Sequence, residues 1–189
     1  MKLIIAITGA SGSIYGTRLL EFLKERQDVE THLIISNAAE GVVPYETGYE
    51  NIEQVKKLAD YCYRNNDLAA AVSSGSFLTS GMIVIPCSAK TLSAVANSYG
   101  ENLIARTCDV SLKERRKLVL VFRETPLNLS HIENMRKITR MGGIILPPIP
   151  GFYYKPQTID DLINHIVGKV LDQFGIEHDL FKRWGNTNK

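Results

Sequence analysis

The sequence predicts an α/β fold in which a mostly parallel sheet lies between two layers of helices. Short apolar runs, most of them rich in isoleucine and valine, alternate along the chain with longer segments of helical periodicity. Such runs are typical of strands buried on both faces, and strand–helix alternation indicates right-handed crossovers between parallel strands. The predicted strands cover residues 3–8, 31–36, 82–86, 118–122 and 143–146.

The predicted helices fill the intervals between these strands and follow the last one. They cover residues 13–26, 52–61, 91–97, 103–116 and 130–141. The clearest helix begins after Thr158, a good capping residue, and ends before Gly175. Its apolar residues recur at the i, i+3, i+4 spacing of a helix with one buried face: Ile159, Leu162, Ile163, Ile166, Val167, Val170, Leu171 and Phe174.

Length and composition indicate an ordinary globular protein. We expect one domain over residues 1–189, with a tail from about residue 176, because no repeat, low-complexity tract or interdomain linker interrupts the chain. The content of 44% hydrophobic and 22% charged residues is that of a globular protein. A net charge of +2 is too small to indicate nucleic acid binding or a polybasic membrane anchor.

The cysteines and histidines give no sign of a metal site. Cys62, Cys87 and Cys108 are far apart, as is usual for reduced thiols, and the four histidines have neither metal-ligand spacing nor a nucleophile partner motif. The sequence lacks a signal-peptide pattern and any apolar run of about 18 residues. We therefore expect a cytoplasmic protein without a metal and without hydrolase chemistry.

The segment from Ile4 to Gly16 predicts an anion site. An apolar strand passes through a glycine–serine turn into a helix, whose unpaired N-terminal amides attract phosphate. The spacing G-x-x-G-x-x-x-G differs from the dinucleotide pattern, and Ser36 and Asn37 stand where an NAD site has an acidic residue. A tight turn without a ligand remains the alternative.

Segments with unusual residues follow four of the predicted strands, at 8–12, 36–39, 86–91 and 123–126. The carboxyl ends of parallel strands share one edge of the sheet, so we expect these segments to form one site there. Hydroxyls and amides suit a phosphate and a planar polar ring. Simple helix capping by Ser36 and Ser88 is the alternative.

Charged residues near the predicted fourth helix have an ordinary explanation. Arg106, Asp109 and Lys113 lie near one helical face, and Asp109 and Lys113 have the spacing of an i, i+4 ion pair. Arg115 and Arg116 complement the negative end of the helix and need no functional role.

Charged residues directly after a buried strand are less easily explained than those on a helix surface. Arg123 and Glu124 follow the predicted strand 118–122, which favours a cleft that solvates or pairs them. Glu46 and Tyr153 have ordinary surface or loop-packing alternatives, and Lys169 is at the edge of an apolar stripe, where lysines usually extend to solvent.

Taken together, the motifs resemble the UbiX/Pad-type flavin prenyltransferases nearly from end to end. These proteins were formerly described as aromatic acid decarboxylases or their subunits. The motifs that carry the resemblance are Gly9-Ala10-Ser11-Gly12 with Tyr15-Gly16, Ser73-Ser74-Gly75-Ser76-Phe77, Pro86-Cys87-Ser88, Asp109-Val110 with Leu112-Lys113-Glu114-Arg115-Arg116, Arg123-Glu124-Thr125-Pro126-Leu127, Pro150-Gly151-Phe152-Tyr153 and Arg183-Trp184.

The resemblance implies a Rossmann-like flavoprotein that joins the dimethylallyl group of dimethylallyl phosphate to N5 and then C6 of reduced FMN. The product, prenylated FMN, serves UbiD-type decarboxylases in ubiquinone synthesis or aromatic acid breakdown. No metal is required, and relatives form homo-oligomeric dodecamers with sites at subunit contacts.

The resemblance also implies roles for individual residues. Those implied to contact or adjoin FMN are Gly9, Ala10, Ser11, Ser36, Cys87, Ser88, Ala89, Lys90, Thr91 and Arg123. Those implied to bind the prenyl phosphate are Ser74, Gly75, Arg106, Lys113, Glu124, Tyr153 and Lys169. Ser11, Glu46 and Glu124 are the implied catalytic residues. Two positions depart from the family, which often has arginine at Lys169 and an aromatic residue near Leu68.

Two other functions remain open at this point. A flavin-dependent cysteine decarboxylase shares the flavin fold, but the early catalytic histidine of that class is not found here. A non-catalytic flavin carrier or decarboxylase subunit is the second alternative.

Overall fold

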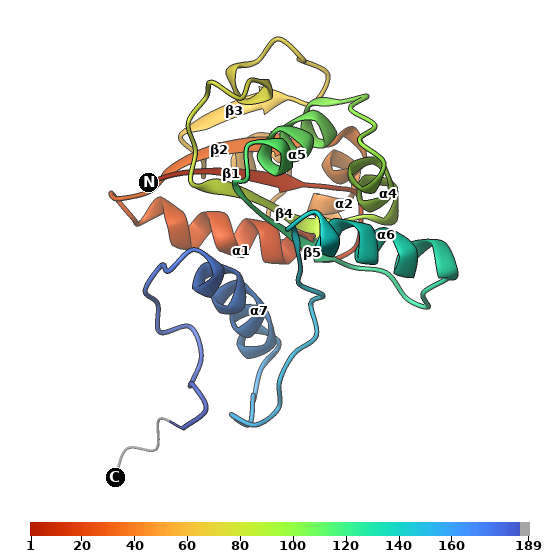
Figure 1. The fold of residues 1–189 in the computed structure, drawn as a ribbon. Helices are drawn as coiled ribbons and strands as arrows, with labels where there is room; N and C mark the ends of the chain where they lie inside the picture. Colours follow the sequence, from red (N-terminus) through yellow and green to blue (C-terminus); the bar gives the residue numbers. More distant parts are fainter. Residues whose placement is uncertain (186–189) are drawn as a thin grey trace.

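The computed structural model describes residues 1–185 and contains a six-stranded, entirely parallel sheet between two helix layers (Figure 1). The strands are β1 (Lys2–Ile7), β2 (Glu30–Ile35), β3 (Tyr61–Arg64), β4 (Gly81–Cys87), β5 (Lys117–Phe122) and β6 (Ile144–Ile145). The helices are α1 (Ser13–Lys24), α2 (Asn37–Glu46), α3 (Ile52–Lys56), the short 3-10 helix η1 (Ala71–Ser73), α4 (Ala89–Ala96), α5 (Leu103–Lys113), α6 (Leu129–Arg140) and α7 (Ile159–Gln173).

The strand order β3-β2-β1-β4-β5-β6 places β1 and β4 at the centre of the sheet. The chain first builds the sheet outward from β1 on one side and then from β4 on the other. Ligands of open parallel sheets bind beyond the strand ends at such a reversal of order. The topology thus selects the C-terminal ends of β1 and β4 as the place for a site.

Two apolar cores lie on opposite faces of the sheet, because successive side chains of a strand point to opposite faces. In β1, Leu3, Ile5 and Ile7 pack into the core that α1, α2, α3 and α7 cover. Ile4 and Ala6 pack into the core that α4, α5 and α6 cover. This double burial explains the near-continuous apolar runs, and it confirms the predicted three-layer α/β fold.

The five predicted strands match the observed ones to within a residue at each end, but β3 was not predicted. The predicted helix over 52–61 is wrong beyond Lys56, where α3 ends. Asp60 accepts hydrogen bonds from the Thr31 amide and hydroxyl at 2.7 and 2.9 Å, which ties the chain to the start of β2. The chain therefore enters the sheet as β3, an edge strand whose side chains are mostly exposed and carry little apolar pattern.

The α2 helix was also not among the predicted helices. It contains Gly41 and Pro44, which are poor helix formers, and it buries only Ala39 and Val43. Its apolar pattern is therefore weak in the sequence. Tertiary contact with α1 and α3 holds it in place.

The predicted last helix is confirmed as α7. The Thr158 hydroxyl accepts from the Asp161 amide at 3.1 Å, and Gly175 has a positive φ of 66° just beyond the helix. The chain after α7 folds back on it, since Arg183 donates to Asp172 at 2.6 Å. Figure 1 shows α7 and this segment below α1, and α7 packs into the same core as α1, against β4 and β5. None of the helices in residues 1–185 is long and apolar enough to cross a bilayer.

Candidate functional site

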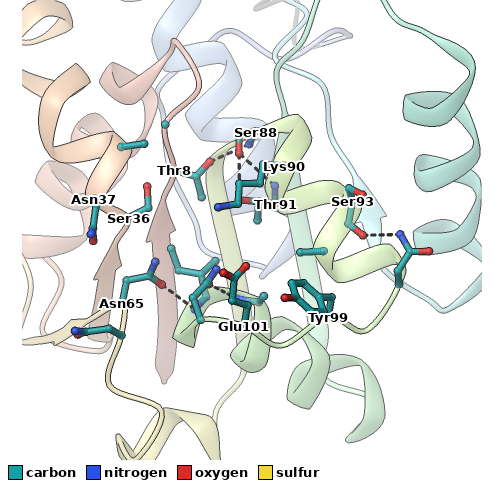
Figure 2. A pocket seen from close by; sticks show the side chains of 18 residues that line it. Thr8, Ser36, Asn37, Asn65, Ser88, Lys90, Thr91, Ser93, Tyr99 and Glu101 are labelled. Atoms are coloured by element: carbon teal, nitrogen blue, oxygen red, sulfur yellow. Dashed lines mark hydrogen bonds between the residues drawn. The ribbon is translucent and has the colours of Figure 1, made fainter.

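A cavity of about 990 Å³ opens at the C-terminal ends of β1 and β4 (Figure 2). Its walls come from the turns after β1, β2, β3 and β4, from α4 and from the start of α5. The lining residues are Thr8, Gly9, Ser36, Asn37, Ala38, Asn65, Asn66, Ser88, Lys90, Thr91, Ser93, Ala94, Asn97, Tyr99, Glu101, Asn102, Ile104 and Ala105. The cavity therefore lies where the strand order predicts a ligand.

Thr8 joins the ends of the two central strands beneath this cavity. Its hydroxyl donates to the Pro86 carbonyl at 2.8 Å and accepts from the Ser88 amide at 2.9 Å. The side chain is buried, so both bonds are shielded from water. Figure 2 shows Thr8 and Ser88 side by side on this wall. The resulting floor is rigid, because breaking either bond leaves a buried polar group without a partner.

Two helices begin at the cavity wall with a serine cap. Ser36 Oγ accepts from the Ala39 amide at 3.2 Å at the start of α2. Ser88 Oγ accepts from the Thr91 amide at 3.3 Å and donates to the Thr91 hydroxyl at 3.1 Å at the start of α4. The capping interpretation of both serines is thus confirmed. Both also line the cavity, so they bring the positive ends of two helices to it.

The N-terminus of α1 has a different arrangement. Glu46, at the end of α2, accepts from the Gly12 and Ser13 amides at 2.8 Å each and from the Ser13 hydroxyl at 2.7 Å. The protein's own carboxylate thus occupies the position that an anion would take. The expectation that these amides hold a phosphate is wrong, because Glu46 already satisfies them.

Two glycines of the segment from Ile4 to Gly16 are required by the turn before α1 and by the packing of α1 on the central strands. Gly12 has a φ of 102°, a left-handed conformation that favours glycine, at the residue before α1. A Cβ on Gly16 would lie 2.5 Å from the Ile85 carbonyl oxygen and 3.0 Å from Ile7, because α1 packs directly against the central strands. The glycine spacing therefore reflects the turn and the helix–strand contact.

The electrostatics around Glu46 favour its ionised form. Burial raises its pKa, but hydrogen bonds from Ser11, Ser13 and the Gly12 amide outweigh burial and hold the pKa below its ordinary value. Burial also raises the pKa of Tyr15, with Arg123 lowering it and Glu46 raising it. Hydrogen bonds from residues 11–13 thus stabilise the Glu46 carboxylate, and the charges of Glu46 and Arg123 act in opposite directions on the pKa of Tyr15.

The implied FMN residues divide into two sets. Gly9, Ser36, Ser88, Lys90 and Thr91 line the cavity, whereas Ala10, Ser11, Cys87, Ala89 and Arg123 are not among its lining residues.

Cys87 departs most from expectation, because its side chain is fully buried in the core beneath α4 and burial raises its pKa. Its carbonyl instead accepts from the Arg123 amide at 3.1 Å. The Cys87 side chain does not form the cavity wall.

The implied prenyl-phosphate residues lie outside this cavity, in three places. Ser74, Gly75, Arg106 and Lys113 come together along α5, where Arg106 Nε donates to the Ser73 carbonyl at 3.3 Å. A Cβ on Gly75 would lie 2.9 Å from Lys113 Nζ. The expected Asp109–Lys113 ion pair is wrong, because Asp109 pairs with Arg106 at 3.2 Å and Lys113 pairs with Glu114.

The remaining implied substrate residues lie after β5 and around α7. Glu124 follows Arg123, is half-buried and accepts from the Thr125 amide at 3.1 Å. The Tyr153 ring lies 5.5 Å from the Trp184 ring, and Lys169 Nζ lies 3.8 Å from Asp172. Leu68, the other family departure, is exposed.

Several cavity residues were missed in the sequence, notably Asn65, Asn66, Tyr99 and Glu101. Asn65 fixes the start of α5, since its carbonyl accepts from Leu103 at 2.8 Å and its side chain accepts from the Ile104 amide at 3.1 Å. Recognition of β3 would have placed Asn65 and Asn66 at a strand end, beside the other polar segments. Within residues 1–185, no cluster of His, Cys, Asp or Glu is arranged to hold a metal ion.

Comparisons with known proteins agree with this geometry. The Flavoprotein family model matches residues 1–171. The flavin prenyltransferase UbiX of Methanocaldococcus jannaschii is 52% identical over 187 residues, which are 99% of this chain and 100% of that relative.

Solved structures give the same picture. A dodecameric FMN-dependent UbiX-like decarboxylase from Escherichia coli O157:H7 has a TM-score of 0.96 at 50% identity, covering 98% of this chain and 100% of that one. A UbiX protein solved with FMN and dimethylallyl pyrophosphate has a TM-score of 0.95 at 49% identity, covering 99% and 98%. A peptidyl-cysteine decarboxylase, with a TM-score of 0.63 at 18% identity over 79% and 82% of the chains, shares the fold alone. The chain therefore belongs to the flavoprotein family and, within it, to the UbiX-type flavin prenyltransferases.

Proposed function

We propose that this protein transfers the dimethylallyl group of dimethylallyl phosphate to N5 and C6 of reduced FMN. The observation that carries the proposal is similarity over the full length, at about half identity, to relatives named flavin prenyltransferase and to a UbiX protein solved with FMN and dimethylallyl pyrophosphate. The alternative of a cysteine decarboxylase has only a distant likeness of fold behind it.

The chemistry of the cavity fits FMN. A volume of about 990 Å³ is at the upper end of ordinary ligand pockets, which span roughly 300–1,000 Å³. We assign the flavin phosphate to the capped starts of α2 and α4, where Ser36, Ser88 and Thr91 offer hydroxyls and Lys90 adds a positive charge. Gly9 and Asn65 border the remaining space. When bound and reduced, FMN supplies the nucleophilic N5 and C6 atoms.

Four positively charged side chains are suited to stabilise the phosphate that leaves dimethylallyl phosphate. Breaking the allylic C–O bond leaves negative charge on phosphate, and Arg106, Lys113, Arg123 and Lys169 are assigned to stabilise it, with a hydrogen bond from Tyr153. Lysine at position 169 keeps the charge but lacks the two-pronged grip of arginine.

Proton transfer is assigned to three residues. Glu124 would exchange a proton with the phosphate, and Ser11 is assigned to act near the flavin N5. Forming the C6 bond releases a proton from that carbon to Glu46 or to the phosphate. Glu46 is ionised, as a proton acceptor must be, and its hydrogen bonds from Ser11 and Ser13 make it a weaker base than an ordinary glutamate.

The site is assigned to contacts between subunits of a homo-oligomer. In one chain the assigned phosphate residues lie in separate places, on α5, after β5 and around α7, whereas one phosphate must touch them together. The segments around α7 expose Phe152 at 70%, Ile159 at 76% and Trp184 at 81%, as interfaces do. The E. coli relative is dodecameric. A dodecamer would bring the separate groups together.

We also propose a domain organisation, a cellular location and a recipient of the product. The whole chain is one folding unit, because both cores share one sheet. It works in the cytoplasm, consistent with free thiols at Cys62, Cys87 and Cys108, and passes prenylated FMN to a UbiD-type decarboxylase.

The test is direct. The protein is incubated anaerobically with FMN, dithionite and dimethylallyl phosphate, and the flavin is examined by mass spectrometry. We expect a flavin heavier by one dimethylallyl group, and much less of it with Glu124→Gln. Glu133→Gln, on the surface of α6, is the matched control and retains full activity. Bound FMN without the adduct, with the pyrophosphate also tried, contradicts the function. Undiminished activation of a decarboxylase by Glu124→Gln favours a non-catalytic flavin carrier.

A further inference from the structure

Arg116 has contacts that its place in the sequence does not explain. It follows α5, where a basic residue usually interacts with the helix end. Its guanidinium instead donates from Nη1 to the Phe77 carbonyl at 2.7 Å and from Nη2 to the Gly75 carbonyl. One side chain therefore holds two carbonyls of a segment about forty residues earlier, which we call the 73–77 loop.

The end of α5 fixes the base of this side chain. The Arg116 amide donates to the Ser111 carbonyl at 2.8 Å and the Arg115 amide to the Leu112 carbonyl at 3.1 Å, the paired bonds of a Schellman motif. Arg115 has the positive φ of 57° that this motif requires. The backbone at Arg116 is thus held in one conformation, and its side chain is half-buried while that of Arg115 is exposed.

The loop has further attachments at both ends. Arg106 donates to the Ser73 carbonyl at 3.3 Å. The Phe77 ring lies 4.9 Å from His32 in an edge-on contact, and 5.4 Å from Lys2 Nζ. Among the hydrogen bonds of residues 1–185, only those of Arg116 join the middle of the loop to the chain at the end of α5. Its bond to Gly75 sets the segment that carries Ser74 and Gly75 beside Lys113.

We propose that Arg116 is a positioning residue for the prenyl-phosphate site, holding Ser74 and Gly75 against Lys113 before substrate arrives. This inference rests on the proposed function, which assigns those three residues to the phosphate. An ordered loop binds substrate without losing conformational freedom at that step, so affinity rises. The flat guanidinium fork matches two carbonyls at once, whereas a lysine ammonium at this position reaches only one.

The test compares Arg116→Lys with Arg115→Lys. Both variants keep the charge, and they change neighbouring residues, of which only Arg116 contacts the loop. For Arg116→Lys we expect the KM for dimethylallyl phosphate to rise about tenfold, with kcat at saturation and FMN affinity within about twofold of wild type. Arg115→Lys keeps the wild-type KM. Arg116→Gln is a second variant if the lysine variant does not fold.

Hydrogen exchange supplies a readout that does not need turnover. Without substrate, a peptide covering the 73–77 loop exchanges faster in Arg116→Lys than in wild type or Arg115→Lys. Unchanged KM and unchanged exchange in folded Arg116→Lys overturn the proposal. An equal loss of FMN binding and kcat, with KM unchanged, assigns Arg116 a general structural role and also overturns it. Faster loop exchange in a protein whose wild type makes no prenylated flavin refutes the proposed function while the loop contact stands.

Discussion

The N-termini of α1 and α4 are reached by similar turns, but different groups bind their first amides. Both helices follow a central strand through a short turn of small residues. At α1 the first amides bind Glu46, a carboxylate from α2. At α4 the cap is the helix's own Ser88, and the first turn lines the cavity.

The difference teaches that a helix N-terminus is available to an anion only if no carboxylate of the fold already occupies it. The glycine-rich turn before α1 has the stronger sequence resemblance to a phosphate loop, yet α2 returns a carboxylate to it. The plainer connection from β4 to α4 has no such partner, and its Ser88 lines the cavity. The four predictions below test this contrast, from the largest expected effect to the smallest.

Glu46→Ala removes the acceptor of two amides and a hydroxyl at α1. We expect the free energy of unfolding to fall by about 3 kcal/mol in urea titrations, because these donors lose a charged partner. Glu50→Ala, at an exposed position, is the control and costs less than about 0.5 kcal/mol. The vacated helix end then resembles a true anion site, so phosphate raises the Tm of Glu46→Ala more than that of wild type. An equal phosphate response in both proteins refutes the contrast.

Thr8→Val breaks the link between the ends of β1 and β4. The Pro86 carbonyl and the Ser88 amide lose their partner in a buried place, which we expect to cost about 2 kcal/mol. Thr17→Val is the matched control, because Thr17 is also buried but its hydroxyl bonds only within α1. Equal losses for the two variants, measured by thermal unfolding, would show that the link does not stiffen the cavity floor.

The dependence of stability on pH tests whether Glu46 is charged in the folded protein. Its pKa in the folded protein lies below the ordinary 4.5, so the carboxylate stabilises the fold above that value and loses its effect as pH falls through the folded pKa. Wild type is therefore more stable than Glu46→Gln at pH 7, by about 1–2 kcal/mol. We expect the gap to narrow as the pH falls below the ordinary value of 4.5 and through the lower pKa of the folded protein. A gap that stays constant with pH contradicts a charged cap.

Ser88→Ala tests the N-terminus of α4, which lines the cavity. Loss of the cap costs about 1 kcal/mol, and the same serine is assigned to FMN, so flavin affinity falls several-fold in fluorescence titrations. Asn128→Ala removes the cap of α6, which lies outside the cavity, at similar cost in stability. If both variants bind FMN equally well, the α4 terminus is not part of the flavin site.

Much of the fold was predictable because its signals are local. Strands β1 and β4 are apolar on both faces, and Thr158 and Gly175 mark the ends of α7 by their own side-chain and backbone preferences. Strand β3 and helix α2 were missed because contacts made far along the chain, such as Asp60 with Thr31, hold them in place. The cavity was anticipated at the strand ends, but Asn65 could not be placed there without β3.

The sequence by itself determined the layered fold, the edge of the sheet that carries the cavity, and the family, because burial pattern, turn residues and motifs are properties of neighbouring residues. Only the tertiary structure decided which helix end binds a carboxylate, which charged groups pair, and that Arg116 donates to the 73–77 loop rather than to its own helix. These outcomes depend on which distant atoms come within hydrogen-bonding distance, and no local pattern encodes that distance.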